Sequence, residues 1–100
     1  MGTRLRTKAA DTIYNQMIKV TASDTADTAE GILEMIQGYT AEHQLLGLAS
    51  ALLFLMEQYR IETTDVMSEA HNKVFSGEYN NLAPEFEVLK NYIKEKWELN

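Results

Sequence analysis

The chain has 100 residues, a net charge of −6 and a hydrophobic content of 45%, which together favour one globular domain over a disordered segment. Five glycines and one proline supply too few turn signals for an all-β fold, so helix is the expected class. Because the chain has no cysteine, disulfides and thiolate metal sites are excluded, and a reducing cytoplasm is the expected location.

An amphipathic first helix is predicted for residues 4–20. Apolar residues recur at every fourth position, from Leu5 through Ala9 and Ile13 to Met17. Basic residues crowd the first turns of this helix, where the helix dipole disfavours positive charge. We therefore expect the first few residues to fray.

A second helix is predicted to follow the Thr- and Asp-rich segment 21–28 and to end near Gln37. Three residues with capping side chains are candidates for its N-cap: Ser23, Asp24 and Thr25. Gly38 is expected to close its last turn in a left-handed conformation. Gly31, inside this helix, costs about 1 kcal/mol relative to alanine. A close approach to Gly47 of the next helix would be one reason for a glycine at position 31.

The longest apolar run, residues 45–56, reads LLGLASALLFLM and is apolar on every side when wound as a helix. A helix of this kind is expected to be buried on every side. Its length of about 18 Å falls short of the ~30 Å core of a bilayer, so we predict a core helix and no membrane span. With Thr40 as its N-cap, this helix should run over about residues 41–59.

Two more helices are predicted toward the C-terminus. Thr63 or Thr64 is expected to cap the fourth, which ends at Ser76-Gly77. Pro84 is expected at the first position of the fifth. The apolar stripe of that helix is Phe86, Leu89, Ile93 and Trp97.

These elements predict an all-α fold: a single-domain bundle of about five helices wrapped around the hydrophobic helix at about residues 41–59. The domain should span residues 1–100, with fraying allowed for at residues 1–3.

No catalytic, metal or cofactor-binding site is predicted. His43 directly follows Glu42, and His71 stands two positions after Glu69, so neither pair shares a helix face as a Glu-x-x-His metal motif would. The chain also lacks a glycine-rich phosphate loop and a nucleophile elbow. We therefore predict a non-enzymatic protein that needs no cofactor.

The acidic middle of the chain indicates the kind of partner. Residues 21–70 hold nine acidic residues against Arg60 alone, which disfavours nucleic acid. We predict a small interaction or regulatory protein that binds a protein partner through a helical surface. A viral or mobile-element inhibitor that occupies the basic channel of a host nucleic-acid-binding protein would be one example. The predicted partner-binding residues are Asp24, Asp27, Glu30, Glu34 and Glu42.

Surplus apolar surface further predicts a homodimer. The residues expected at the self-association surface are Gly47, Ala51, Phe54, Tyr59 and Trp97. Two alternatives remain open. One is a helix-turn-helix-like DNA- or RNA-binding regulator that reads through the helix at about residues 64–75. The other is a helical bundle that binds a small ligand between its helices.

Overall fold

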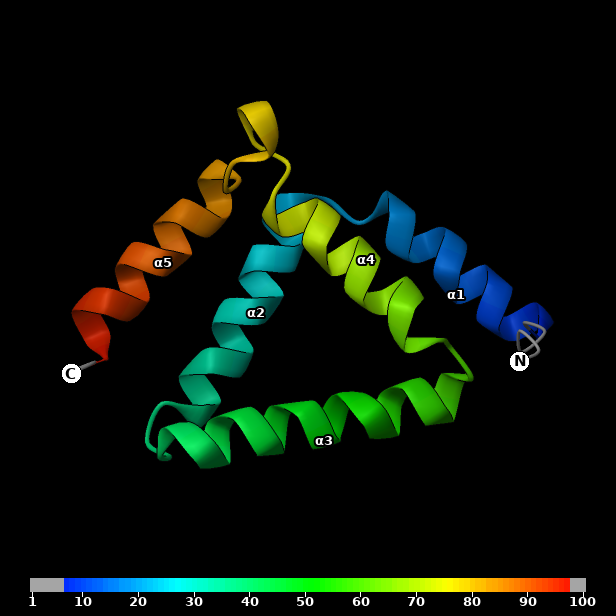
Figure 1. Ribbon diagram of the computed structural model, residues 1–100, viewed down its shortest axis with the longest axis horizontal. Coiled ribbons are helices and arrows are strands. Elements are labelled where there is room, and N and C mark those ends of the chain that lie inside the picture. Colours follow the sequence, from blue (N-terminus) through cyan, green and yellow to red (C-terminus); the bar gives the residue numbers. More distant parts are fainter. Residues whose placement is uncertain (1–6, 98–100) are drawn as a thin grey trace.

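The computed structural model describes residues 7–97 and confirms the all-α class, since no strand occurs in that range. Five α-helices and one 3-10 turn (η1) follow one another along the chain (Figure 1). Their bounds are α1 Lys8–Lys19, α2 Ala22–Ile36, α3 Ala41–Tyr59, α4 Thr63–Val74, η1 Glu78–Asn80 and α5 Pro84–Lys96. Residues 4–6 of the expected first helix, and residues 1–3 with their expected fraying, lie outside the described residues.

Threonine side chains set several of the helix starts. The Thr7 and Thr21 hydroxyls each accept a hydrogen bond from a backbone N–H in the first turn, at 3.0 Å. Thr40 is the N-cap of α3, and Pro84 opens α5, both as predicted.

Two of the predicted caps are wrong. The second helix starts earlier than expected, because Thr21 already caps it and places the three candidate residues within the first turn. Helix α4 is preceded by Glu62 at its N-cap, and Thr63 is already helical.

A left-handed residue closes α3, and the predicted left-handed Gly38 does not occur. No described glycine has a positive φ, whereas Arg60 has φ 56°. The Ile61 N–H donates to the Met56 carbonyl at 3.0 Å, which bypasses Arg60 and satisfies the helix end. Met56 and Ile61 are both buried at this corner between α3 and α4.

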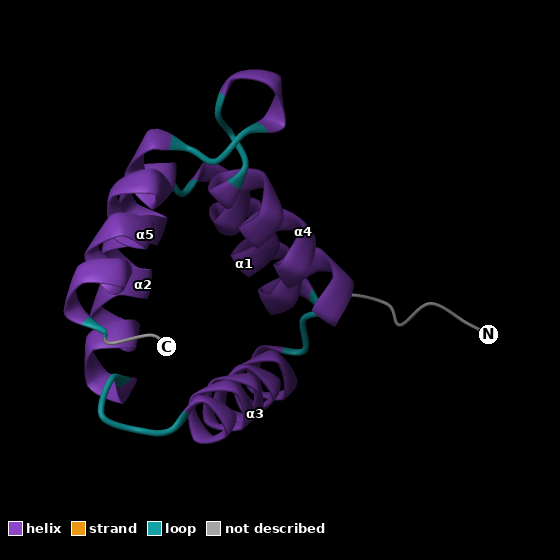
Figure 2. Ribbon diagram, turned by 60° about the vertical axis from the view of Figure 1, so that its left-hand side comes forward, coloured by secondary structure: helices purple, strands orange, loops and turns teal. Residues whose placement is uncertain are grey.

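Helix α2 packs against α5, helix α1 contacts both α4 and α3, and α3 connects the two groups of helices at one end (Figure 2). At the other end α2 also contacts α4, so α2, α3 and α4 outline a triangle (Figure 1). This open shape has a Cα radius of gyration of 15.1 Å, against about 13 Å for a compact chain of this length.

The predicted position of the apolar helix at the centre of the bundle is wrong. Of the 19 residues of α3, all of them described, only Met56 is buried. The chain turns away from α3 at both of its ends, so α2 and α4 converge on each other and do not lie along α3. The expected approach of Gly31 to Gly47 is also absent, since a Cβ at either position would meet no described atom within 4 Å.

The hydrophobic core lies between α2 and α5. It is built on Ala26, Ala83, Phe86 and Leu89. The Ala83 N–H donates to the Val74 carbonyl at 2.7 Å, which ties the start of α5 to the end of α4. Within the described residues, no helix is both long enough and apolar enough to cross a membrane.

Candidate interaction surfaces

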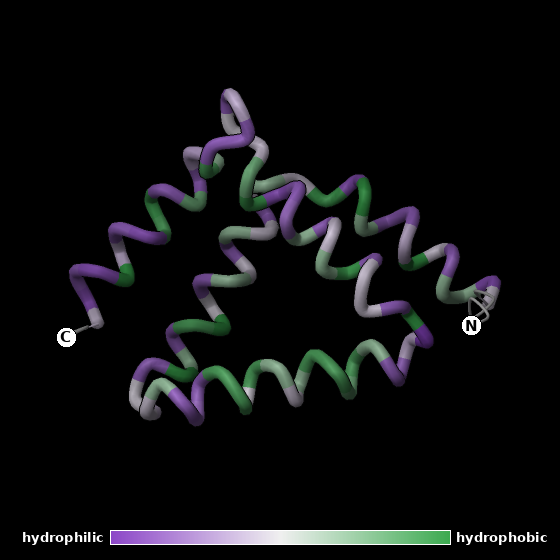
Figure 3. The backbone as a smooth tube through the Cα atoms, in the orientation of Figure 1, coloured by the Kyte–Doolittle hydropathy of each residue, from purple (hydrophilic) through white to green (hydrophobic). Residues whose placement is uncertain are grey.

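Helix α3 is the most apolar helix of the fold (Figure 3). Most of its large apolar side chains are exposed. Phe54 is 78% exposed, and Leu45 and Leu46 are 72% and 71% exposed. The large apolar side chains that α3 exposes are Leu45, Leu46, Leu48, Leu53, Phe54, Leu55 and Tyr59. A helix with this composition normally lies inside a protein. The structure therefore leaves a core-like helix open to water.

The size of this apolar surface can be worked out from the exposures. At about 100 Å² for a leucine side chain and about 200 Å² for an aromatic one, the exposed side chains of α3 present roughly 550 Å². Met35 and Tyr39, just before α3 in the chain, are 81% and 64% exposed and raise the total to about 800 Å². These side chains lie on two sides of α3, because Leu46 and Phe54 lie opposite the side that carries Leu45, Leu48, Leu55 and Tyr59, so the total is spread around the helix.

Three of the predicted self-association residues share one side of α3. Gly47, Ala51 and Phe54 follow helical spacing, lie opposite the Leu52–Met56 side of the helix, and are exposed. Tyr59 lies at the C-terminal end of α3 and is 48% exposed. Trp97 does not belong to this surface, because it follows α5 and is half-buried.

A second candidate surface is an acidic groove between α2 and α5. Asp27 and Glu30 of α2 line it together with Glu85 of α5, and its volume is about 290 Å³. Glu34 continues the same side of α2 one turn beyond Glu30. Three of the five predicted partner-binding residues therefore lie together. Asp24 is exposed near the start of α2 and does not line the groove, and Glu42 lies on α3.

The acidic groove has one fixed polar contact at its end. The Tyr92 hydroxyl donates a hydrogen bond of 2.7 Å to Glu34 Oε1. This hydrogen bond, followed by desolvation and by the negative charges of Glu34 and Glu30, raises the pKa of Tyr92 above its ordinary value. Glu42 has a different environment, since hydrogen bonds with the Thr40 side chain and with its own backbone N–H lower its pKa.

Helix α4 is the recognition helix of the alternative DNA- or RNA-binding function. Lys73 is its only lysine or arginine. The Lys73 ammonium donates to the Ile18 carbonyl at 3.0 Å and forms an ion pair of 3.4 Å with Glu69. The cation that would meet a phosphate is therefore engaged within the fold, which weakens the support for this alternative.

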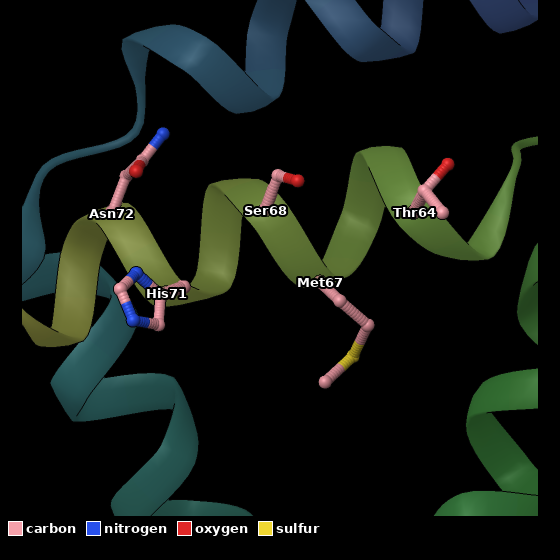
Figure 4. Close-up of a pocket in the computed structure, with 5 residues that line it drawn as sticks. All are labelled: Thr64, Met67, Ser68, His71 and Asn72. Atoms are coloured by element: carbon pink, nitrogen blue, oxygen red, sulfur yellow. The ribbon is translucent and has the colours of Figure 1, made fainter.

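The other face of α4 carries a shallow depression of about 350 Å³ (Figure 4). Thr64, Ser68 and Asn72 point to one side of the helix there, while Met67 and His71 point to the other. The five side chains thus do not converge on one point. The His71 ring lies against Phe75, with 4.7 Å between the ring centroids. Nothing in this arrangement encloses a ligand, so it lends no support to a small-ligand site.

Within residues 7–97, no three His, Asp or Glu side chains come together in a way that could hold a metal ion. Comparison with known proteins finds no matching family model, no similar curated protein and no similar solved structure.

Sequence reasoning missed Glu85 as a member of the acidic groove. Its position in the first turn of α5 was evident, but the packing of α5 against α2 was not. Leu46 was also missed from the self-association surface. It is next to Gly47 and about two turns before Phe54 on the same exposed side of α3, and only the exposure of that side identifies it.

Proposed function

We propose that this chain is a non-enzymatic interaction protein whose working surface is helix α3. The observation that supports this function is the exposure of seven large apolar side chains on one helix. Burying roughly 550 Å² of apolar surface at about 25 cal/mol per Å² would release on the order of 14 kcal/mol before the costs of association. A surface of this size favours a protein partner.

The total accessible surface supports the same proposal. It is 7905 Å², whereas a compact monomer of this mass exposes roughly 5,800 Å². The larger value goes with the open arrangement of the helices, which leaves α3 uncovered. In this proposal the chain reaches its functional state when a partner covers α3.

The acidic groove between α2 and α5 supports a second, electrostatic role. Asp27, Glu30 and Glu85 present carboxylates from two helices, a chemistry suited to lysine or arginine side chains of a partner. A regulatory protein that inhibits a nucleic-acid-binding partner in the cytoplasm would use the groove in this way. This role is a proposal that rests on charge alone.

A photo-crosslinking experiment tests the α3 surface. A photoreactive phenylalanine derivative replaces Phe54 in one variant, and Tyr79 in the control variant. Both side chains are aromatic and exposed, at 78% and 88%, but Tyr79 lies in η1, away from α3. The variants are irradiated in extract of the cells that naturally make the protein. We expect adducts with a protein at position 54 and not at position 79. Absence of adducts at position 54, or equal adducts at both positions, would refute the proposed function.

A further inference from the structure

Helix α5 has a second groove beside it, distinct from the acidic groove. Four apolar side chains and two lysines line this α5 groove: Leu82, Phe86, Leu89, Lys90, Ile93 and Lys94. Its volume is about 420 Å³, within the range of about 300–1,000 Å³ that small-molecule sites have. We propose that the α5 groove binds the alkyl chain of a fatty acid, whose carboxylate pairs with Lys90 and Lys94. This inference goes beyond the proposed function and does not depend on it.

The apolar side chains of the α5 groove are already largely covered within the chain. Phe86 and Leu89 are only 9% and 8% exposed, because they also form the core between α2 and α5. Leu82 and Ile93 are half-buried. A partner helix would need large exposed side chains to pack against, as α3 offers and this groove does not. An alkyl chain needs no such side chains, because it can lie in the space that the groove leaves open. The groove therefore favours an alkyl chain over a protein helix.

The two lysines indicate which polar group the ligand carries. Lys90 and Lys94 are exposed, lie one helical turn apart, and have no ion-pair partner within residues 7–97. Glu85 lies on the opposite side of α5, and Glu87 does not line the groove. In a chain of net charge −6, two unpaired cations beside apolar side chains are a local exception. Ammonium groups donate charge-assisted hydrogen bonds to a carboxylate, so an anionic head group is favoured over a neutral or cationic one.

The order of these residues along the chain predicts the direction of the ligand. Lys90 and Lys94 lie toward the C-terminal end of α5, whereas Leu82 precedes the helix. The carboxylate should therefore lie near the lysines and the alkyl chain should extend toward Leu82. Trp97, the only tryptophan of the chain, follows Ile93 by one turn, and its backbone N–H donates to the Ile93 carbonyl at 2.9 Å. Its indole ring can thus report on the carboxylate end of the groove.

Quenching of Trp97 fluorescence tests the site in the whole chain. The probes are dodecanoate brominated next to the carboxylate and dodecanoate brominated at the far end of the alkyl chain, both below the concentration at which they form micelles. Because bromine quenches tryptophan only at short range, the first probe should quench Trp97 to saturation, and the second should quench it less. Absence of saturable quenching by either probe would overturn the proposal. Stronger quenching by the second probe would overturn the predicted direction.

Two double variants test the role of the lysines. Lys90→Gln with Lys94→Gln should weaken the binding of the first probe about 2- to 30-fold, because an exposed ion pair contributes only modestly to binding. The matched control is Lys8→Gln with Lys96→Gln, which removes the same charge from two exposed lysines outside the groove and should bind the probe as the unsubstituted chain does. Equal weakening in both double variants, or in neither, would overturn the proposal. The carboxylate would then respond only to net charge, or the alkyl chain would lie on another apolar surface such as α3.

Displacement of the bound probe by unbrominated compounds tests the chemistry of the ligand. Each methylene removed between dodecanoate and octanoate should weaken binding about two- to fourfold, as expected for a buried alkyl chain. Dodecanol, which has no charge, should displace the probe several-fold less effectively than dodecanoate. Equal displacement by octanoate and dodecanoate would overturn the apolar part of the site, and equal displacement by dodecanol would overturn the role of the carboxylate. A response of Trp97 to phosphatidylglycerol vesicles and not to dodecanoate would overturn a free fatty acid in favour of a membrane surface.

Discussion

Two phenylalanine-to-alanine substitutions should have opposite consequences, because the two rings differ in burial. Phe86 belongs to the core between α2 and α5 and is 9% exposed, whereas Phe54 on α3 is 78% exposed. Truncating a buried phenylalanine costs about 3–5 kcal/mol of folding free energy. Phe54→Ala removes few contacts within one chain, so its cost to the folding of that chain should be within about 0.5 kcal/mol.

The effect of Phe54→Ala should appear in association. The exposed part of the ring presents about 150 Å², or up to about 4 kcal/mol at 25 cal/mol per Å². If this ring anchors the α3 surface, its loss should weaken association by about 2–4 kcal/mol, or about 30- to 1,000-fold.

Urea denaturation at several protein concentrations separates these effects. Phe86→Ala should lower the unfolding midpoint at every concentration. Phe54→Ala should match the unsubstituted chain at the lowest concentration and lose the rise in midpoint that mass action gives an associating protein. If Phe54→Ala destabilises the dilute chain as much as Phe86→Ala does, α3 is packed inside the fold and the peripheral position of this helix is refuted.

Three further predictions concern single sites. A Cβ at Gly77 would lie 2.7 and 2.8 Å from two backbone carbonyl oxygens, so Gly77→Ala should lower the free energy of unfolding by about 1–3 kcal/mol in thermal or urea denaturation. Gly31→Ala lies in open space on α2 and should raise the free energy of unfolding by about 1 kcal/mol. Arg60→Gly should raise the melting temperature by a few degrees, because the left-handed conformation of Arg60 costs a residue with a side chain about 1–2 kcal/mol. An unchanged or lower melting temperature would contradict this prediction. The raised pKa of Tyr92 means that the neutral phenol contributes to the stability of the fold. This contribution is fully present below the ordinary tyrosine pKa and is lost as the pH rises through the folded-state pKa. In a phenolate absorbance titration, Glu34→Gln should move this ionisation to lower pH, and an unchanged titration would rule out the hydrogen bond as the cause.

Local chemistry explains which parts of the fold were predictable. The Thr40 cap and the proline at the start of α5 each act within one helical turn, so the sequence alone locates them. Where several capping residues compete, as in the segment before α2, the sequence does not say which one is used. The left-handed Arg60 was not predictable either, because the burial of Met56 and Ile61 at the corner favours a conformation that the residue type does not.

The position of α3 could not be predicted for a different reason. Periodicity identifies an apolar helix, but it does not tell whether the same chain or another chain covers it. The seven exposed side chains of α3 look the same in sequence as those of a buried helix. The acidic groove was predictable only on α2, since spacing placed Glu30 and Glu34 on one face of that helix. The contribution of Glu85 depends on contact between α2 and α5, which are far apart in sequence.

The two candidate surfaces should respond to salt in opposite ways. Residues 44–56 of α3 are uncharged, while the chain as a whole carries a net charge of −6, so the electrostatic term between two copies is a repulsion that salt screens. Self-association through α3 should therefore hold or strengthen as salt rises. Binding of a basic partner in the groove between α2 and α5 would depend on attraction to carboxylates such as Asp27 and Glu85, and salt would weaken it. Because the two surfaces lie on different helices, an α3 pair would leave the groove of each copy open, and one dimer would present two acidic grooves to a basic partner.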